Sequence, residues 1–290
     1  MSLPPNLMEP MRHLLLAALF LAAPARAIEP TPAGPVLGSL IAHMLGRGHY
    51  EKRPLDAAMS RKFLDNLLES YDYGRMYFMK SDVDAFVAEY GDSLGERVKA
   101  GEVGAAYAVY DRFMERLAQR RALVTELLAS SMTFTAAEWA PTERHKDPWA
   151  TTDAEMRERW RLAVKFDLLR GRLEAEKGGK GEDPAKAVVA HHDSLVENYK
   201  QFDSGDVLQN FLSALCRVYD PHTDYFAAAK EENFTIGMKL SLFGIGASLR
   251  NEKGFTSVVS LVPGGPAETD KRLKPGDKIV GVAQGEDGEF

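Results

Sequence analysis

Apolar residues recur at helical spacing along the first three-quarters of the chain. In one segment they fall mostly three, four or seven residues apart, on one helix face; they are Val103, Ala106, Tyr107, Tyr110, Met114, Leu117, Val124 and Leu128. The charged positions between them are expected to face water; they are Arg112, Glu115, Arg116, Arg120 and Arg121. The same spacing predicts helices at 55–71, 156–173, 184–202 and 206–219.

The periodicity changes near Phe234, where short β-rich runs separated by Gly and Pro begin. One such run precedes a turn at 251–254, and another follows it from Phe255 to Val262. We therefore expect an α+β multidomain chain. A mostly α-helical domain covers 36–222, and an incomplete β domain covers 223–290.

The N-terminus is typical of a secretory signal peptide. Arg12 and His13 precede an apolar run at 14–23, and Ala25-Arg26-Ala27 fits the small-x-small cleavage rule. Ten apolar residues are too few to cross a bilayer as a helix. Cleavage would remove 1–27 and leave an extended, Pro-rich leader at 28–35. The alternative is an accidental apolar N-terminus, and Met1, Met8 and Met11 all remain possible starts.

Composition excludes several function classes. With 45% hydrophobic and 27% charged residues, the chain of 290 residues is ordinary globular material. Its formal charge of −6 gives no indication of a nucleic-acid surface. The lone Cys216 excludes an internal disulfide and a multi-cysteine metal site. Its apolar setting predicts a core thiol, with a reactive thiol as the alternative.

The pattern at 242–282 resembles a PDZ domain, a module that captures peptide C-termini. In such a module a peptide adds as a strand, and its carboxylate binds backbone N–H groups of a Gly-containing loop. The candidate loop is Leu242, Phe243, Gly244, Ile245 and Gly246. Phe243 and Ile245 would line the pocket for the last side chain. The alternative is a simple strand bulge at the two glycines.

The second wall of such a groove is a helix that normally follows the Gly-Asp-x-Ile strand. The sequence given offers no such helix after 276–279. We therefore expect a half-built groove with weak or no peptide affinity.

Motifs along the helical part carry a more specific likeness. They include Gly48-His49-Tyr50, the runs 54–60, 74–78 and 165–169, Glu197-Asn198-Tyr199 and Asp220-Pro221-His222-Thr223. The chain resembles the N-terminal region of the bacterial tail-specific proteases, which are periplasmic carboxy-terminal-processing serine peptidases. The resemblance implies an exported endopeptidase that recognises the C-terminal tails of substrate proteins.

In that family a Lys activates a Ser nucleophile in a domain that follows the PDZ domain. The sequence given contains no such domain, so we expect no catalytic residue here and no activity of this chain alone. The resemblance also implies a periplasmic adaptor lipoprotein as a partner and possible association with the inner membrane. No cofactor is expected.

Two histidine motifs invite a chemical reading. In Asp220-Pro221-His222-Thr223 the His could act as a base and the Thr as a weak nucleophile, but we expect a structural domain junction. In His191-His192-Asp193 adjacent rings point about 100° apart on a helix, which disfavours a metal site. We expect that motif on a solvated helix face.

Two other functions were considered. A non-catalytic periplasmic peptide-binding or adaptor module remains open. A chymotrypsin-like protease with an attached PDZ domain is disfavoured by domain order, because its β-rich catalytic domain would precede the PDZ domain. Here the preceding region, 36–219, has helical periodicity.

Overall fold

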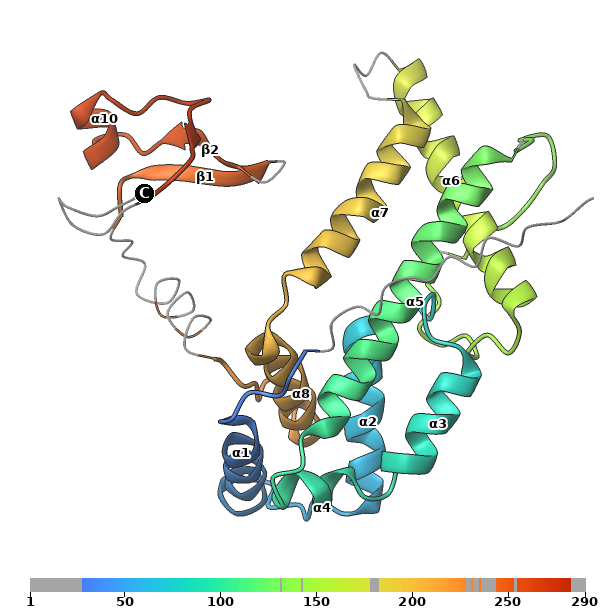
Figure 1. Ribbon diagram of the computed structural model, residues 1–290, viewed down its shortest axis with the longest axis vertical. Helices are drawn as coiled ribbons and strands as arrows, with labels where there is room; N and C mark the ends of the chain where they lie inside the picture. Colours follow the sequence, from blue (N-terminus) through green and yellow to red (C-terminus); the bar gives the residue numbers. More distant parts are fainter. Residues whose placement is uncertain are drawn as a thin grey trace, which may run out of the picture. The chain divides into compact units, whose positions relative to one another are not determined.

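The computed structural model describes residues 28–130, 132–141, 143–177, 183–227, 231, 235, 244–252 and 255–282. The chain divides into two compact units, one up to Tyr225 and one from Phe226 (Figure 1). The first is helical and the second carries a small antiparallel sheet. The predicted fold class, a helical domain followed by a β domain, is confirmed. The expected signal peptide at 1–27 lies outside the described residues.

Eight described helices build the first unit. They are α1 (Gly34–Gly48), α2 (Ala57–Asp72), α3 (Lys80–Tyr90), α4 (Leu94–Lys99), α5 (Gly104–Ala129), α6 (Asp153–Glu176), α7 (Pro184–Lys200) and α8 (Ser204–Tyr219). The long helix α5 contacts α2, α6, α7 and α8. The five helices predicted from apolar spacing are confirmed. Helix α1 begins at Gly34, so the last two residues of the expected leader are helical.

Local sequence signals fix several helix starts. The Asp56 side chain accepts from the backbone N–H of Met59 at 2.9 Å and caps α2. Asp203 and Asp206 form a reciprocal capping box at α8, each accepting the other's backbone N–H. Helix α7 has Pro184 in its first turn, where a missing N–H costs nothing.

Two apolar cores hold the helical unit together. The larger involves α1–α5 and α8, and contains the ring pair Phe63–Phe211 with centroids 4.7 Å apart. The smaller lies between α5, α6 and α7 and includes Trp160. Cys216 belongs to the larger core, where burial raises the pKa of its thiol to about 12. The prediction of a core thiol is confirmed.

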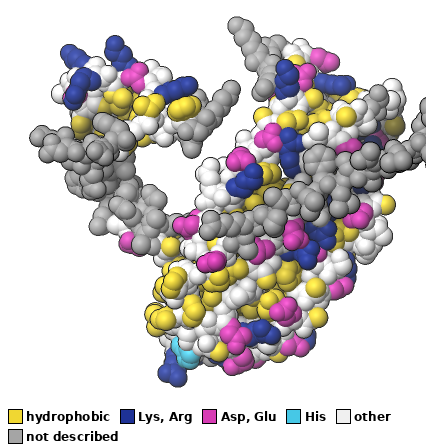
Figure 2. All heavy atoms as spheres, in the orientation of Figure 1, with side chains coloured by type: hydrophobic (Ala, Val, Ile, Leu, Met, Phe, Trp, Pro, Cys, Tyr) yellow, Lys and Arg dark blue, Asp and Glu magenta, His cyan; other side chains and the backbone are white. Residues whose placement is uncertain are grey.

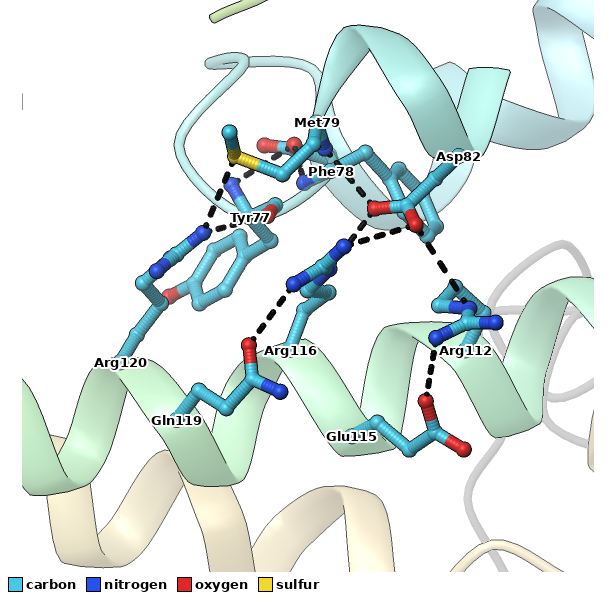
Figure 3. A network of polar contacts seen from close by, with 10 residues as sticks. Tyr77, Phe78, Met79, Asp82, Arg112, Glu115, Arg116, Gln119 and Arg120 are labelled. Carbon is cyan, nitrogen blue, oxygen red and sulfur yellow. Dashed lines mark hydrogen bonds and ion pairs between the residues drawn. The ribbon is translucent and has the colours of Figure 1, made fainter. Parts of the chain in front are cut away.

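The expectation that all charged residues of α5 face water was wrong for Arg116 and Arg120. Figure 3 shows both side chains directed from α5 toward the turn and helix start that carry Tyr77, Met79 and Asp82. Arg116 donates to both carboxylate oxygens of Asp82 at 2.7 and 2.8 Å. Arg120 is buried and donates to the carbonyl oxygen of Tyr77 at 3.3 Å. The start of α3 covers this stripe, so tertiary packing places the two cations inside.

The second unit is a three-stranded sheet with a short helix. It contains β1 (Ala247–Glu252), β2 (Phe255–Leu261), α10 (Pro266–Asp270) and β3 (Lys278–Ile279), and the strand order is β1-β2-β3. All pairings are antiparallel, with a register shift between Ser248 and Leu249. Among its described residues, the buried hydrophobic side chains are Val258 and Ala267.

Candidate functional site

The described part of the candidate carboxylate-binding loop is Gly244, Ile245 and Gly246, directly before β1. Leu242 and Phe243 lie outside the described residues. Gly246 has φ +75°, a left-handed conformation that disfavours a side chain. A Cβ there would lie 3.0 Å from Pro266 Cδ, so the loop also depends on close approach to the start of α10.

The carbonyl groups of this loop are turned toward the corner that precedes α10. The N–H of Ala267 donates to the Ile245 carbonyl, and the N–H of Val262 donates to the Gly246 carbonyl, both at 2.8 Å. No hydrogen bond runs from the N–H of Gly244, Ile245 or Gly246 to any described residue. With the Ile245 and Gly246 carbonyls bonded, and no acceptor for these N–H groups among the described residues, the loop can donate to the oxygen atoms of an anion.

Strand β1 forms an edge of the described sheet, since β2 separates it from β3. Every second residue of an edge strand turns its N–H and C=O away from the neighbouring strand, where another strand can pair. Ile245 and Leu249, 49% and 44% exposed, lie on the loop and on this strand. Together the loop and the edge offer a place for an extended peptide.

The predicted junction motif, 220–223, forms a hydrogen-bond network around the Asp220 carboxylate at the end of α8. The Asp220 carboxylate accepts from the Thr223 hydroxyl and from the backbone N–H of His222, the latter at 2.8 Å. These hydrogen bonds, with a further one from His49, lower the pKa of Asp220 to about 2. The carboxylate thus remains ionised at neutral pH. Pro221 is exposed beside it.

His49, which follows α1 near the start of the helical unit in sequence, also joins this hydrogen-bond network. Its Nε2 lies 3.4 Å from an Asp220 oxygen, and its Nδ1 accepts from the N–H of Glu51 at 3.3 Å. Both ring nitrogens are therefore engaged. Nε2 also lies 3.4 Å from the Thr223 hydroxyl, but that hydroxyl donates its proton to Asp220. The arrangement offers no free general base aimed at a nucleophile.

Sequence reasoning did not select His49 as a partner of Asp220. The two residues are 171 positions apart, and no local pattern connects them. The signal present in the sequence was the short Gly48-His49-Tyr50 motif. The predicted candidate His222 instead has an exposed side chain and contributes its backbone N–H.

The expectation that His191-His192-Asp193 lies on a solvated face was wrong for His192. His192 is 7% exposed, and its ring packs against Trp160 with centroids 5.3 Å apart. Burial, followed by the nearby His191 and Arg121, lowers the pKa of His192 to about 4. Helix α7 faces α6 at this position, so the imidazole is enclosed by the helix pair.

The described residues contain no group of three or more His, Cys, Asp or Glu side chains arranged to hold a metal ion. None of the helices in the described ranges is both long and apolar enough to cross a membrane.

Comparison with known proteins gives two concordant findings. Residues 41–229 match the family described as the tail specific protease N-terminal domain. The tail-specific protease of Haemophilus influenzae is 33% identical over 240 residues, which are 83% of this chain. The same stretch is 34% of that protein, so the chain spans about a third of the length of this relative.

Proposed function

Because the chain belongs to the tail-specific protease family, we propose that it is the N-terminal part of a periplasmic serine endopeptidase. This endopeptidase recognises the C-termini of substrate proteins through a PDZ domain and degrades or processes them. Residues 1–27 act as the signal peptide. The helical domain covers 36–222, and the PDZ domain begins at 223.

The observation that carries this proposal is the geometry of Gly244, Ile245 and Gly246. Their carbonyls that accept hydrogen bonds face the α10 corner, while their N–H groups have no acceptor among the described residues. A peptide carboxylate placed there would receive charge-assisted hydrogen bonds of about 1.5–3 kcal/mol each. Pairing with β1 would add backbone bonds, and association costs reduce the sum to micromolar affinity.

This chain's own residues hold the substrate rather than cut it. We assign the bond-breaking step to a Ser and a Lys outside residues 1–290. We assign no catalytic residue, metal or cofactor within that range. Asp220, Pro221, His222 and Thr223 serve as a structural junction between the domains. Protein tails are the primary partners; no residue here is assigned to an adaptor lipoprotein.

Fluorescence anisotropy tests the proposed recognition. A labelled decapeptide with two apolar C-terminal residues is titrated, as free acid and as C-terminal amide, into the polypeptide that the complete reading frame encodes. The free acid should bind at least about tenfold more tightly, equal to about 1.4 kcal/mol. Equal affinity for the acid and the amide would overturn recognition of the carboxylate.

The same titration with residues 28–290 tests the expectation of a half-built groove. The described part of the second unit contains one named helix, the five-residue α10. If the groove lacks a second helical wall, residues 28–290 should bind the peptide weakly or not at all. Low-micromolar binding would contradict that expectation and favour the self-sufficient peptide-binding module.

A further inference from the structure

A pocket of about 290 Å³ opens in the helical unit. None of its lining residues belongs to the candidate peptide-binding loop at 242–246. Its walls come from the end of α2, the turn after it, the middle of α6 and the middle of α7. Six aromatic or imidazole rings line it: Tyr71, Tyr73, Tyr77, Trp160, His191 and His192. Its volume is close to the lower end of ligand pockets in proteins.

The rings form an ordered wall rather than a loose cluster. Trp160 is fixed because its indole N–H donates to the Met76 carbonyl at 2.7 Å. Tyr77 meets Trp160 edge-on with centroids 5.6 Å apart, and His192 meets it edge-on at 5.3 Å. Tyr73 is 59% exposed at the pocket and stacks on His145. A fixed aromatic surface of this kind attracts cations through the ring faces.

The ionisable groups around the pocket also favour a positively charged ligand. Its lining includes the carboxylates of Asp72 and Asp167, and no Lys or Arg is among the described residues that line it. The pKa of His192 is lowered to about 4, so this imidazole adds no positive charge at neutral pH. Asp72 is tied to the backbone N–H groups of Met76, Tyr77 and Phe78.

Asp167 is the carboxylate with freedom to meet a ligand. Its side chain is 34% exposed, and its ion pair is with Arg170, 3.0 Å away and 62% exposed on the same helix. An exposed pair of this kind contributes little, so a bound cation can replace it at small cost.

We propose that this pocket binds the alkylammonium or guanidinium side chain of a Lys or Arg residue in an extended polypeptide. The aromatic rings would surround the cation and its aliphatic stem, and Asp167 would pair with its charge. The polypeptide part rests on the proposed function, in which this chain handles protein tails. The pocket would then be a second contact for the substrate, set apart from the carboxylate loop.

Solution NMR on residues 28–290 tests the proposal, with the indole N–H of Trp160 as reporter. The probes are N-acetyl-lysine methylamide and its uncharged counterpart N-acetyl-norleucine methylamide. The lysine probe should shift the Trp160 signal in a saturable way, and the norleucine probe should bind at least about tenfold more weakly. Equal effects of the two probes would overturn the assignment of a cation site.

Two substitutions locate the site and one serves as a matched control. Asp167→Asn and Tyr73→Leu should each lower the affinity for the lysine probe about three- to tenfold. Glu158→Gln removes the same charge from α6, but Glu158 pairs with Arg161 and is absent from the pocket lining. The Glu158→Gln variant should bind the lysine probe as tightly as the unaltered protein does. Equal losses of affinity in Asp167→Asn and Glu158→Gln would show a general electrostatic effect and overturn the assignment of the pocket as the binding site.

A third probe separates a peptide subsite from a site for free amines. n-Butylammonium has the charged stem without the peptide backbone, and should bind more weakly than the lysine probe. If it binds as tightly, the peptide part of the proposal fails while the cation site stands. None of the three probes involves the carboxylate loop, so failure here leaves the proposed function untouched. Failure of acid–amide discrimination leaves the cation site untouched.

Discussion

The imidazole of His49, just after α1, lies 3.4 Å from the carboxylate of Asp220, just after α8. The ring also packs against Tyr219, with centroids 5.2 Å apart. This contact joins the beginning and the end of the helical unit's sequence, and Asp220 lies five residues before the unit ends at Tyr225.

Replacement of His49 by Ala should therefore destabilise the helical unit by about 1–3 kcal/mol, because a buried ring and its hydrogen bonds are lost. Urea unfolding of residues 28–290, followed by far-ultraviolet circular dichroism, measures the change. His222→Ala is the matched control, because its side chain is exposed and its role uses the backbone N–H. It should change stability by less than about 0.5 kcal/mol. Equal losses in the two variants would contradict the assigned roles.

Arg116→Ala should be more damaging than its position on a charged helix stripe suggests. The change leaves Asp82, whose side chain is 5% exposed, without its bidentate partner (Figure 3). We expect a loss of about 2–4 kcal/mol in the free energy of unfolding. Arg112→Ala supplies the comparison, because Arg112 lies 3.6 Å from the same carboxylate but is 45% exposed. A loss below about 1 kcal/mol is expected for it; the opposite ranking would refute the buried pair.

His192 should make the protein less stable in mild acid. Its folded-state pKa is about 4, against 6.5 for an ordinary imidazole. The unfolded chain therefore takes up a proton first, and stability is lost as the pH falls from about 6.5 toward 4. Thermal unfolding between pH 7 and 5 should show a smaller fall in Tm for His192→Gln than for the unaltered protein.

The exposed neighbour provides the control for this pH effect. His191→Gln should keep most of the fall in Tm, because burial rather than His191 is the largest cause of the lowered pKa of His192. Asp72 acts with the opposite sign, since burial raises its pKa to about 6 and the folded state then binds protons more readily. That contribution is common to all three proteins, so the differences between their pH profiles isolate His192. Identical profiles for all three would show that His192 is not held neutral by the fold.

Gly246→Ala should disturb the second unit, whereas Gly244→Ala should not. At Gly246 the backbone has φ +75° and an added Cβ meets Pro266, while a Cβ at Gly244 meets nothing within 4 Å. We expect a cost of about 1–2 kcal/mol for Gly246→Ala. Amide hydrogen exchange across β1 and β2 measures it, and equal protection in the two variants would contradict the strained loop.

The sequence predicted most of the helical unit because apolar spacing is a local property. Helix α5 shows the limit of that reasoning. Its apolar face was recognised, yet Arg116 and Arg120 were expected in water, because nothing in α5 indicates that the start of α3 covers its charged side. The burial of His192 against Trp160 depends on the same kind of distant packing.

For the candidate loop, the sequence indicated the need for glycines but not which one is indispensable. The motif Gly244-Ile245-Gly246 has the same residue type at both ends. Only Gly246 has the positive φ and the close neighbour, because the α10 corner packs against it. His49 and Asp220 likewise come together only in the folded chain, as their partnership spans 171 positions.

Cleavage of a tailed substrate by the polypeptide of the complete reading frame tests the central claim most directly. The substrate is one reporter protein that carries an unstructured tail ending either in two apolar residues or in two aspartates. The account predicts fast degradation of the apolar-tailed reporter, slow degradation of the acidic-tailed one, and loss of the difference in Gly246→Val but not in Gly244→Ala. Equal rates for both tails, or the same preference in all variants, would contradict recognition of substrate tails by this loop.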